Sequence, residues 1–167
     1  MKPKIIPAHM RTAENYAEQS SARRLKVGAI LVKDNRIISI GYNGMPEGWD
    51  NNCENEIYSH FENEVGNKDS IIETYPYVDD DGSRFRLVTK PEVLHAEANA
   101  ITKVARSSES SEDSILFVTH APCIECAKLI YQSGIKEVYF KNYYRSDAGL
   151  KFLEKSGIPV TQIKDEK

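Results

Sequence analysis

The chain is organised around two short stretches, His95-Ala96-Glu97 and Pro122-Cys123-Ile124-Glu125-Cys126. Together they supply one imidazole, two thiols and a spare carboxylate, and zinc prefers nitrogen and sulfur ligands. A catalytic zinc site typically keeps three protein ligands and leaves the fourth position to water. His95, Cys123 and Cys126 would make three, and Glu97 is left to move protons to and from that water. The two stretches therefore predict one catalytic zinc site.

The spacing of the two cysteines supports a shared metal. Cys123 and Cys126 are three residues apart at the predicted start of a helix, which places both sulfur atoms on one face. A helix N-terminus favours negative charge, so this position should favour the thiolates that zinc needs. For an isolated Cys-x-x-Cys pair, a structural zinc site or a redox site would together be about as typical as a catalytic metal site, but the accompanying His-x-Glu favours the catalytic metal. We expect His95 to complete the set if two helix N-termini converge.

Length and composition indicate one folded domain spanning residues 1–167. Hydrophobic residues make up 40% of the chain and charged residues 28%, both near the averages of globular proteins. No apolar run approaches the roughly 20 residues that cross a bilayer, and the first residues lack the apolar core of a signal peptide. We therefore expect a soluble, cytoplasmic protein with no membrane contact. The net charge of −3 argues against a protein that follows nucleic acid, because such proteins carry a basic surplus.

The pattern of apolar residues predicts an α/β fold with a mixed sheet of five strands. Apolar periodicity and small-residue composition predict helices over residues 9–22, 95–106, 123–133 and 147–156. Runs of β-branched and apolar residues predict strands at 27–32, 36–42, 115–119, 137–140 and 160–163. Asp34-Asn35 offers turn chemistry for a hairpin between the first two strands. The later strands alternate with helices, which implies parallel neighbours and helices that cover the sheet.

A long polar segment at about 47–91 interrupts this pattern. It is punctuated by glycine and proline, and its patchy periodicity around residues 57–65 predicts a loop-rich insertion that carries a short helix. Insertions of this length within a domain are usually functional or mobile. The cluster Asp79-Asp80-Asp81-Gly82 lacks the spaced ligands of a calcium loop and predicts a hairpin turn instead.

The two opening stretches resemble the His-x-Glu and Pro-Cys-x-x-Cys signature of zinc-dependent nucleobase deaminases. Over about residues 20–163 the chain most resembles the deoxycytidylate (dCMP) deaminase family. The resemblance rests on five stretches: Val27-Gly28-Ala29, Gly41-Tyr42-Asn43-Gly44-Met45-Pro46, His95 to Ile101, Pro122 to Lys128, and Gln132-Ser133-Gly134-Ile135-Lys136. It implies a three-layer α-β-α, cytidine deaminase-like fold.

The resemblance also implies an activity. Members of the family hydrolyse dCMP to dUMP and ammonia, which supplies dUMP for thymidylate synthesis. They are usually hexamers, activated by dCTP and inhibited by dTTP with Mg²⁺. By resemblance, His95, Cys123 and Cys126 are the ligands of one Zn²⁺, and Glu97 is the acid and base that serves the ring nitrogen and the leaving ammonia.

Four further residues are candidates for substrate binding. Arg24 stands where the family has an arginine three residues before Val-Gly-Ala, and it could bind the phosphate, although such an arginine is more often a solvated surface charge. Asn43, at a strand end, could bind the sugar hydroxyl. Tyr144 could pack on the substrate or bind its phosphate, and Ala96 lies between a metal ligand and Glu97.

The family associates its Gly-Tyr-Asn-Gly segment with regulation, so Gly41, Tyr42, Asn43 and Gly44 are candidate effector contacts. The same residues are common at the end of a hairpin, and that alternative stays open.

The chain also departs from the family pattern. Many relatives carry a second zinc site with a cysteine shortly before Val-Gly-Ala, where this chain has Ala22. Cys53, His9 and His60 restore no evident ligand set, so we expect a single zinc. His120 replaces the usual leucine before Pro-Cys, and we expect it to have no metal role. Two alternatives to dCMP deamination remain at this point: a deaminase of another base, in a nucleoside or in RNA, and a zinc-stabilised binding module.

Overall fold

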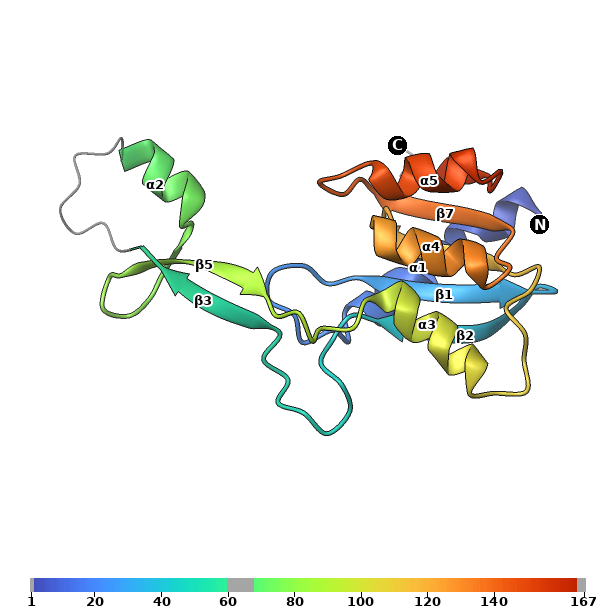
Figure 1. Cartoon of the computed structure of the whole chain (residues 1–167), viewed down its shortest axis with the longest axis horizontal. Helices are drawn as coiled ribbons and strands as arrows, with labels where there is room; N and C mark the ends of the chain where they lie inside the picture. The colour runs from blue at the N-terminus through green and yellow to red at the C-terminus, as the bar shows by residue number, and fades with distance from the viewer. Residues whose placement is uncertain (1, 60–67, 165–167) are drawn as a thin grey trace.

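The computed structural model describes residues 2–59 and 68–164. A main body carries a five-stranded sheet, and an arm extends from it (Figure 1). Among the helices in the described part of the chain, none is long and apolar enough to cross a membrane.

The main sheet has the order β2-β1-β6-β7-β8. Its strands are β1 (Gly28–Lys33), β2 (Arg36–Tyr42), β6 (Ile115–His120), β7 (Glu137–Asn142) and β8 (Val160–Gln162). β1 is antiparallel to β2 and β6, whereas β6, β7 and β8 run parallel. The predicted mixed five-stranded sheet is therefore confirmed, with the predicted hairpin at one edge.

Helices cover both faces of this sheet. A 3₁₀ turn (Pro3–Ile5) leads into α1 (Ile6–Ala17) on one face, and the other face carries α3 (Ala96–Ala105), α4 (Ile124–Gln132) and α5 (Ala148–Lys155). Successive residues of β1 point to opposite layers: Ile30 packs in the cluster of α1, whereas Ala29 and Leu31 pack in the cluster of α3 and α4. Because both faces are buried, β1 and β6 read as continuous apolar runs. The three-layer α-β-α fold is confirmed.

The first helix begins earlier than the sequence predicts. It spans Ile6–Ala17 rather than 9–22, because Pro7 lies in its first turn, where the missing N–H needs no partner. Residues 18–22 instead form a connection in which the buried hydroxyl of Ser20 donates to the carbonyl of Asn43 at 2.7 Å.

Two glycines let helices lie close to the edge hairpin. A Cβ atom on Gly28 would come within 2.0 Å of the Ala13 carbonyl oxygen in α1. A Cβ atom on Gly41 would come within 2.1 Å of the Ala96 carbonyl oxygen in α3. Both close approaches are to helix backbone, which cannot move aside as a flexible side chain can.

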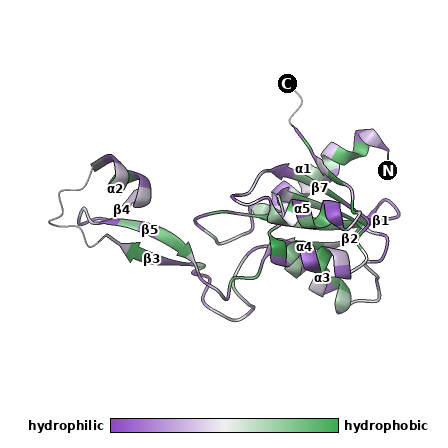
Figure 2. Cartoon of the chain, turned by 45° about the horizontal axis from the view of Figure 1, so that its top comes forward, coloured by the Kyte–Doolittle hydropathy of each residue, from purple (hydrophilic) through white to green (hydrophobic). Residues whose placement is uncertain are grey.

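The arm contains a second sheet that the sequence analysis missed. Its strands are β3 (Glu54–Tyr58), β4 (Tyr77–Val78) and β5 (Arg84–Thr89), in the order β3-β5-β4, together with α2 (Lys68–Thr74). The predicted short helix in the insertion is confirmed as α2, but its predicted position around 57–65 is wrong at the start, since Ile57 and Tyr58 are in β3. Residues 60–65 lie outside the described part of the chain. The signal for β5 is the alternation of buried Phe85 and Leu87 with arginines. Figure 2 shows hydrophobic (green) colour on β5.

The predicted hairpin turn in the arm is confirmed. Residues 79–83 join β4 to β5, and the Gly82 N–H donates to the Asp79 carbonyl oxygen at 3.1 Å. Gly82 has a φ of +88°, which an L side chain would rarely adopt. The aspartate cluster therefore serves a turn.

Candidate active site

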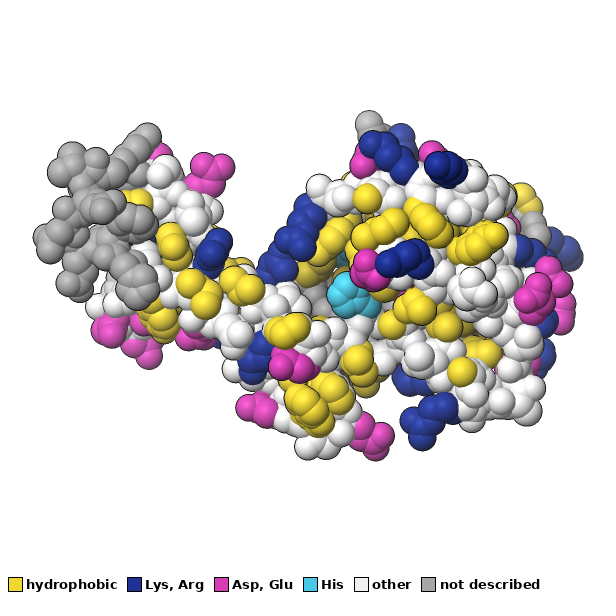
Figure 3. Space-filling view, viewed as in Figure 1, with side chains coloured by type: hydrophobic (Ala, Val, Ile, Leu, Met, Phe, Trp, Pro, Cys, Tyr) yellow, Lys and Arg dark blue, Asp and Glu magenta, His cyan; other side chains and the backbone are white. Residues whose placement is uncertain are grey.

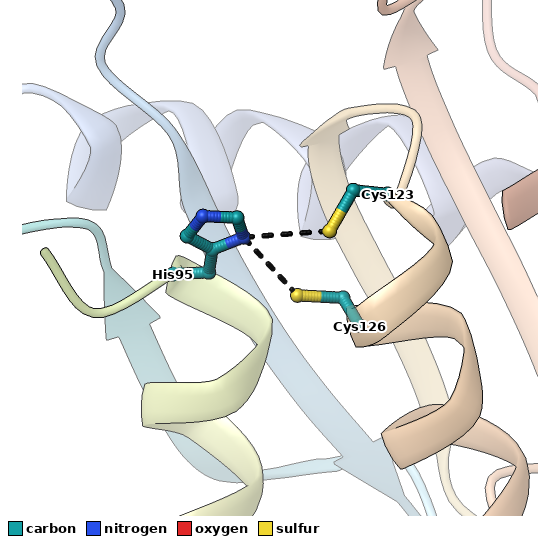
Figure 4. Close-up of side chains that lie close together, drawn as sticks. All are labelled: His95, Cys123 and Cys126. Atoms are coloured by element: carbon teal, nitrogen blue, oxygen red, sulfur yellow. Dashed lines mark hydrogen bonds between the residues drawn. The ribbon is translucent and has the colours of Figure 1, made fainter. Parts of the chain in front are cut away.

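The N-termini of α3 and α4 meet on one face of the main sheet. His95 is the residue just before α3, Cys123 is the residue just before α4, and Cys126 lies in the first turn of α4. Nδ1 of His95 lies 3.6 Å from Sγ of Cys123 and 3.3 Å from Sγ of Cys126 (Figure 4). The convergence that the sequence analysis required is therefore present.

The three side chains fit a zinc ion. Their ligand atoms lie within 4.8 Å of one another. Tetrahedral zinc with the usual Zn–N and Zn–S bond lengths separates nitrogen from sulfur by about 3.5 Å, close to both distances between His95 and the cysteines. One imidazole and two thiolates are also the donor types that zinc prefers.

Hydrogen bonds within the cluster shift the pKa values of the two thiols in opposite directions. Cys126 and His95 hydrogen-bond to Cys123 and lower the pKa of its thiol to about 3. The same bond to Cys123, together with burial, raises the pKa of the Cys126 thiol. The hydrogen bond to Cys123 also raises the pKa of His95. These shifts favour the thiolate form of Cys123 and the protonated form of His95, and because zinc binds thiolates and neutral imidazole, metal binding is expected to release protons.

Glu97 is a buried carboxyl group next to this cluster. It lies in the first turn of α3, is 4% exposed and lines the same cavity as His95 and Cys123. Burial raises the pKa of its carboxyl group above its usual range, and the nearby His95 opposes this effect. A carboxyl group of raised pKa can both hold and release a proton near neutral pH, as an acid and base requires.

A cavity of about 370 Å³ opens over the cluster and collects the predicted substrate residues. Arg24, Asn43, Ala96 and Tyr144 all line it. Figure 3 shows imidazole (cyan) in the hollow between the main body and the arm, with basic side chains (dark blue) beside it.

Arg24 and Asn43 already have partners there. The exposed Arg24 donates from Nη1 to Oγ1 of Thr89 at 2.9 Å. The Asn43 side chain accepts from the Val27 N–H and donates to the Leu25 carbonyl oxygen, both at 2.8 Å. Asn43 therefore holds the loop before β1 in place, and each end of its amide keeps one further hydrogen-bonding position.

Lys90, Arg145 and His120 also line the cavity, and the sequence analysis assigned none of them to the substrate. The Arg145 guanidinium lies 5.4 Å from the centre of the Tyr144 ring, so its place next to Tyr144 in sequence was a usable signal. Lys90 directly follows β5, at the base of the arm, and no local sequence pattern pointed to it. Nδ1 of His120 lies 3.2 Å from Oγ1 of Thr119, outside the metal cluster.

The candidate effector segment mainly holds α3 to the sheet. Gly41 lies against the α3 backbone, and the Tyr42 carbonyl oxygen accepts from Asn99 at 2.8 Å. Gly44 exchanges backbone hydrogen bonds with Leu94, the residue before His95. Of the four residues, Asn43 lines the cavity.

Cys53, the third cysteine, lies in an apolar region. Cys53 is buried in a cluster with Ala22 and Val93. Within residues 2–59 and 68–164, the group of His, Cys, Asp or Glu side chains with metal-binding geometry is His95, Cys123 and Cys126. His9 packs against Phe117 on the α1 face, and His60 lies outside the described residues.

Comparison with known proteins agrees with the geometry. Residues 4–142 match the family model described as the cytidine and deoxycytidylate deaminase zinc-binding region. The deoxycytidylate deaminase of Enterobacteria phage T2 is 37% identical, with 88% of this chain and 86% of the phage protein covered. The human deoxycytidylate deaminase is 36% identical over 78% of this chain and 62% of its own length.

A solved structure is similar over nearly the whole chain. The dCMP deaminase of cyanophage S-TIM5, in complex with dCMP and dUMP, superposes with a TM-score of 0.77 at 41% identity. The match covers 98% of this chain and 99% of the cyanophage chain. With its His-Cys-Cys cluster and three-layer fold, this chain belongs to the cytidine and deoxycytidylate deaminase family.

Proposed function

We propose that this protein catalyses the zinc-dependent hydrolysis of dCMP to dUMP and ammonia. The observation that carries the proposal is the buried carboxyl group of Glu97, which lines the same cavity as His95 and Cys123 of the His95, Cys123 and Cys126 cluster. Relatives named as dCMP deaminases, similar over most of this chain, support dCMP as the substrate.

The chemistry divides between the metal and Glu97. A zinc ion held by His95, Cys123 and Cys126 would act as a Lewis acid that makes water a nucleophile near neutral pH. Glu97 takes a proton from the water and gives it to the ring nitrogen beside C4 of the pyrimidine. The water oxygen bonds to C4, and Glu97 then moves the remaining proton of that oxygen to the amino group as the C4–N bond breaks, so that a carbonyl replaces the amine at C4 and ammonia leaves. The raised pKa of Glu97 suits both directions of transfer.

The mouth of the cavity supplies contacts for the rest of the nucleotide. Arg24, Lys90 and Arg145 come from three separate segments and place positive charge at the cavity of a protein whose net charge is −3. We assign the phosphate to Arg24, with Lys90 and Arg145 adding to the field. Tyr144 packs against the substrate, and Asn43 offers its remaining amide positions to the sugar hydroxyl.

Ala96 offers a contact for the base. It is the first residue of α3, and the N–H groups of a first helical turn have no partner within the helix. We propose that this N–H binds the carbonyl oxygen of the pyrimidine.

We also propose the regulation and assembly implied by the family resemblance. These are a homohexamer, activation by dCTP and inhibition by dTTP with Mg²⁺ through Gly41 to Gly44. We propose one catalytic domain over 1–167, with residues 47–91 as its insertion, and supply of dUMP for thymidylate synthesis in the cytoplasm. Light scattering gives the subunit number. If the rate does not respond to dCTP, or to dTTP with Mg²⁺, the proposed regulation is refuted, whereas the proposed catalytic activity is unaffected.

The substrate is tested by rates measured side by side on dCMP, deoxycytidine and a cytosine-containing oligonucleotide. We expect dCMP to have the highest kcat/KM, because the cationic mouth binds its phosphate. A higher kcat/KM for deoxycytidine or for the oligonucleotide would show that the deaminase acts on that substrate rather than on dCMP. No ammonia from any of the three would favour a zinc-stabilised binding module.

A further inference from the structure

Glu54 is a buried carboxylate outside the catalytic cluster. It is the first residue of β3, at the base of the arm, and is 1% exposed. Its Oε1 accepts the backbone N–H groups of Arg23 and Arg24, each at 3.1 Å, and its Oε2 lies 3.2 Å from the Arg23 nitrogen. A buried carboxylate is costly unless it is hydrogen-bonded, so Glu54 and the loop before β1 fix each other.

Thr89 binds the other end of Arg24. It faces Glu54 across the β3–β5 pair, and its Oγ1 accepts from the Arg24 guanidinium at 2.9 Å. Two cross-strand neighbours at the base of the arm therefore hold one arginine, Glu54 through the main chain and Thr89 through the side chain. Figure 1 shows this end of β5 beside the loop that leads into β1.

The fixed position of Arg24 suggests how the arm contributes to substrate binding. Arg24 is exposed yet lines the cavity, and Thr89 lines the same cavity. A long side chain that is ordered before its ligand arrives loses less conformational freedom on binding, which improves affinity without a new contact.

We propose that Glu54 and Thr89 are positioning residues that preset Arg24 for the phosphate of the substrate. The arm then contributes to the preference for a nucleotide over a nucleoside, although none of its residues takes part in the deamination step. This inference rests on the proposed function, in which the substrate is a nucleoside monophosphate.

The test compares Glu54→Gln and Thr89→Val with a matched control, Glu56→Gln. Glu56 lies two residues further along β3 and is exposed, and it pairs with the Arg23 guanidinium at 2.9 Å. The measurement is kcat and KM for dCMP and for deoxycytidine. Because hydrogen bonds to charged groups are at stake, we expect each positioning variant to raise the KM for dCMP by about 5- to 30-fold. The kcat for dCMP and both constants for deoxycytidine should stay within about twofold, as should all constants of Glu56→Gln.

Repeating the measurement in an Arg24→Ala protein distinguishes a positioning effect on Arg24 from general destabilisation of the fold. In an Arg24→Ala protein, Glu54→Gln and Thr89→Val should raise the KM for dCMP no further, because the side chain they position is gone. Equal effects on both substrates, full additivity with Arg24→Ala, or wild-type constants for both variants would overturn the inference. If Glu54→Gln does not fold, Thr89→Val decides, since it removes one hydroxyl from a partly exposed site. An unmodified protein that leaves dCMP unchanged would instead refute the proposed function.

Discussion

At the scale of single residues, burial distinguishes Glu97 from the other carboxylate of the cavity. Glu125 also lines the cavity, but it is exposed and pairs with Lys128 at 2.6 Å. Glu97 is shielded from solvent, and its raised pKa follows from that burial. Of the two carboxyl groups, Glu97 is the one tuned to exchange protons.

Glu97→Gln should remove turnover and keep the metal. The amide matches the carboxyl group in shape but cannot transfer the proton, so kcat should fall by about 10²- to 10⁴-fold. Zinc content, measured by mass spectrometry, should stay at that of the wild-type protein. Glu92→Gln, on an exposed carboxylate three residues before His95, is the control and should keep its activity. Normal turnover by Glu97→Gln would assign the proton transfer to another group.

Arg24→Ala should discriminate between nucleotide and nucleoside. Loss of a charge-assisted contact to phosphate should lower kcat/KM for dCMP by about 10- to 100-fold and leave deoxycytidine almost unaffected. The control is Arg23→Ala, because the neighbouring Arg23 side chain pairs with Glu56 rather than lining the cavity. Equal losses on both substrates would contradict a phosphate role for Arg24.

Short-range patterns were sufficient to predict the metal cluster but not its surroundings. His95, Cys123 and Cys126 lie at helix starts, where sequence spacing fixes which side chains share a face. Lys90 and Thr89 reach the cavity only because β5 returns from the arm to the main body. That return depends on pairing between segments about thirty residues apart, which no local pattern encodes.

At the scale of elements, the contact between β2 and α3 sets the position of the catalytic residues. The α3 helix begins immediately after His95 and carries Glu97 in its first turn, and it lies against Gly41 of β2. A displacement of α3 would therefore move a metal ligand and the acid–base group together.

Gly41→Ala should destabilise the protein and disturb the site. The added methyl group would meet the Ala96 carbonyl oxygen at 2.1 Å, and overpacking of this kind costs about 1–3 kcal/mol. The free energy of unfolding in urea and the bound zinc should both fall. Gly44→Ala is the matched control, since a Cβ atom there meets nothing within 4 Å. Equal stability of the two variants would show that the contact is not tight.

Elements with strong periodicity or continuous apolar runs were predictable, and the arm was not. The central strands β1 and β6 bury both faces, so their apolar runs stand out in the sequence. In the arm, β3 exposes most of its residues and β4 has only two, so neither shows a usable period. The arm sheet is recognisable mainly through Phe85 and Leu87, which are too few to outweigh the surrounding polarity.

At the scale of the whole molecule, the metal cluster links two helices that come from distant parts of the chain. His95 precedes α3 and the cysteines belong to the start of α4, so a shared ion would connect both helices to each other. Folding and metal binding should therefore be coupled.

Zinc removal should lower both activity and stability. After chelation the protein should lose turnover, and one equivalent of Zn²⁺ should restore it. Free zinc at 100 times its dissociation constant should stabilise the fold by about 2.7 kcal/mol, measured by denaturant unfolding. Full activity in a protein shown to be free of metal would contradict a zinc-dependent reaction.

The central claim is tested most directly by the products formed from dCMP by the purified, zinc-loaded protein. The measurement follows dUMP by chromatography and ammonia by a coupled assay in the same reaction, with and without dCTP and Mg²⁺. We predict that dUMP and ammonia appear in equal amounts and at many turnovers per zinc. Recovery of intact dCMP with no ammonia under both conditions would contradict the account.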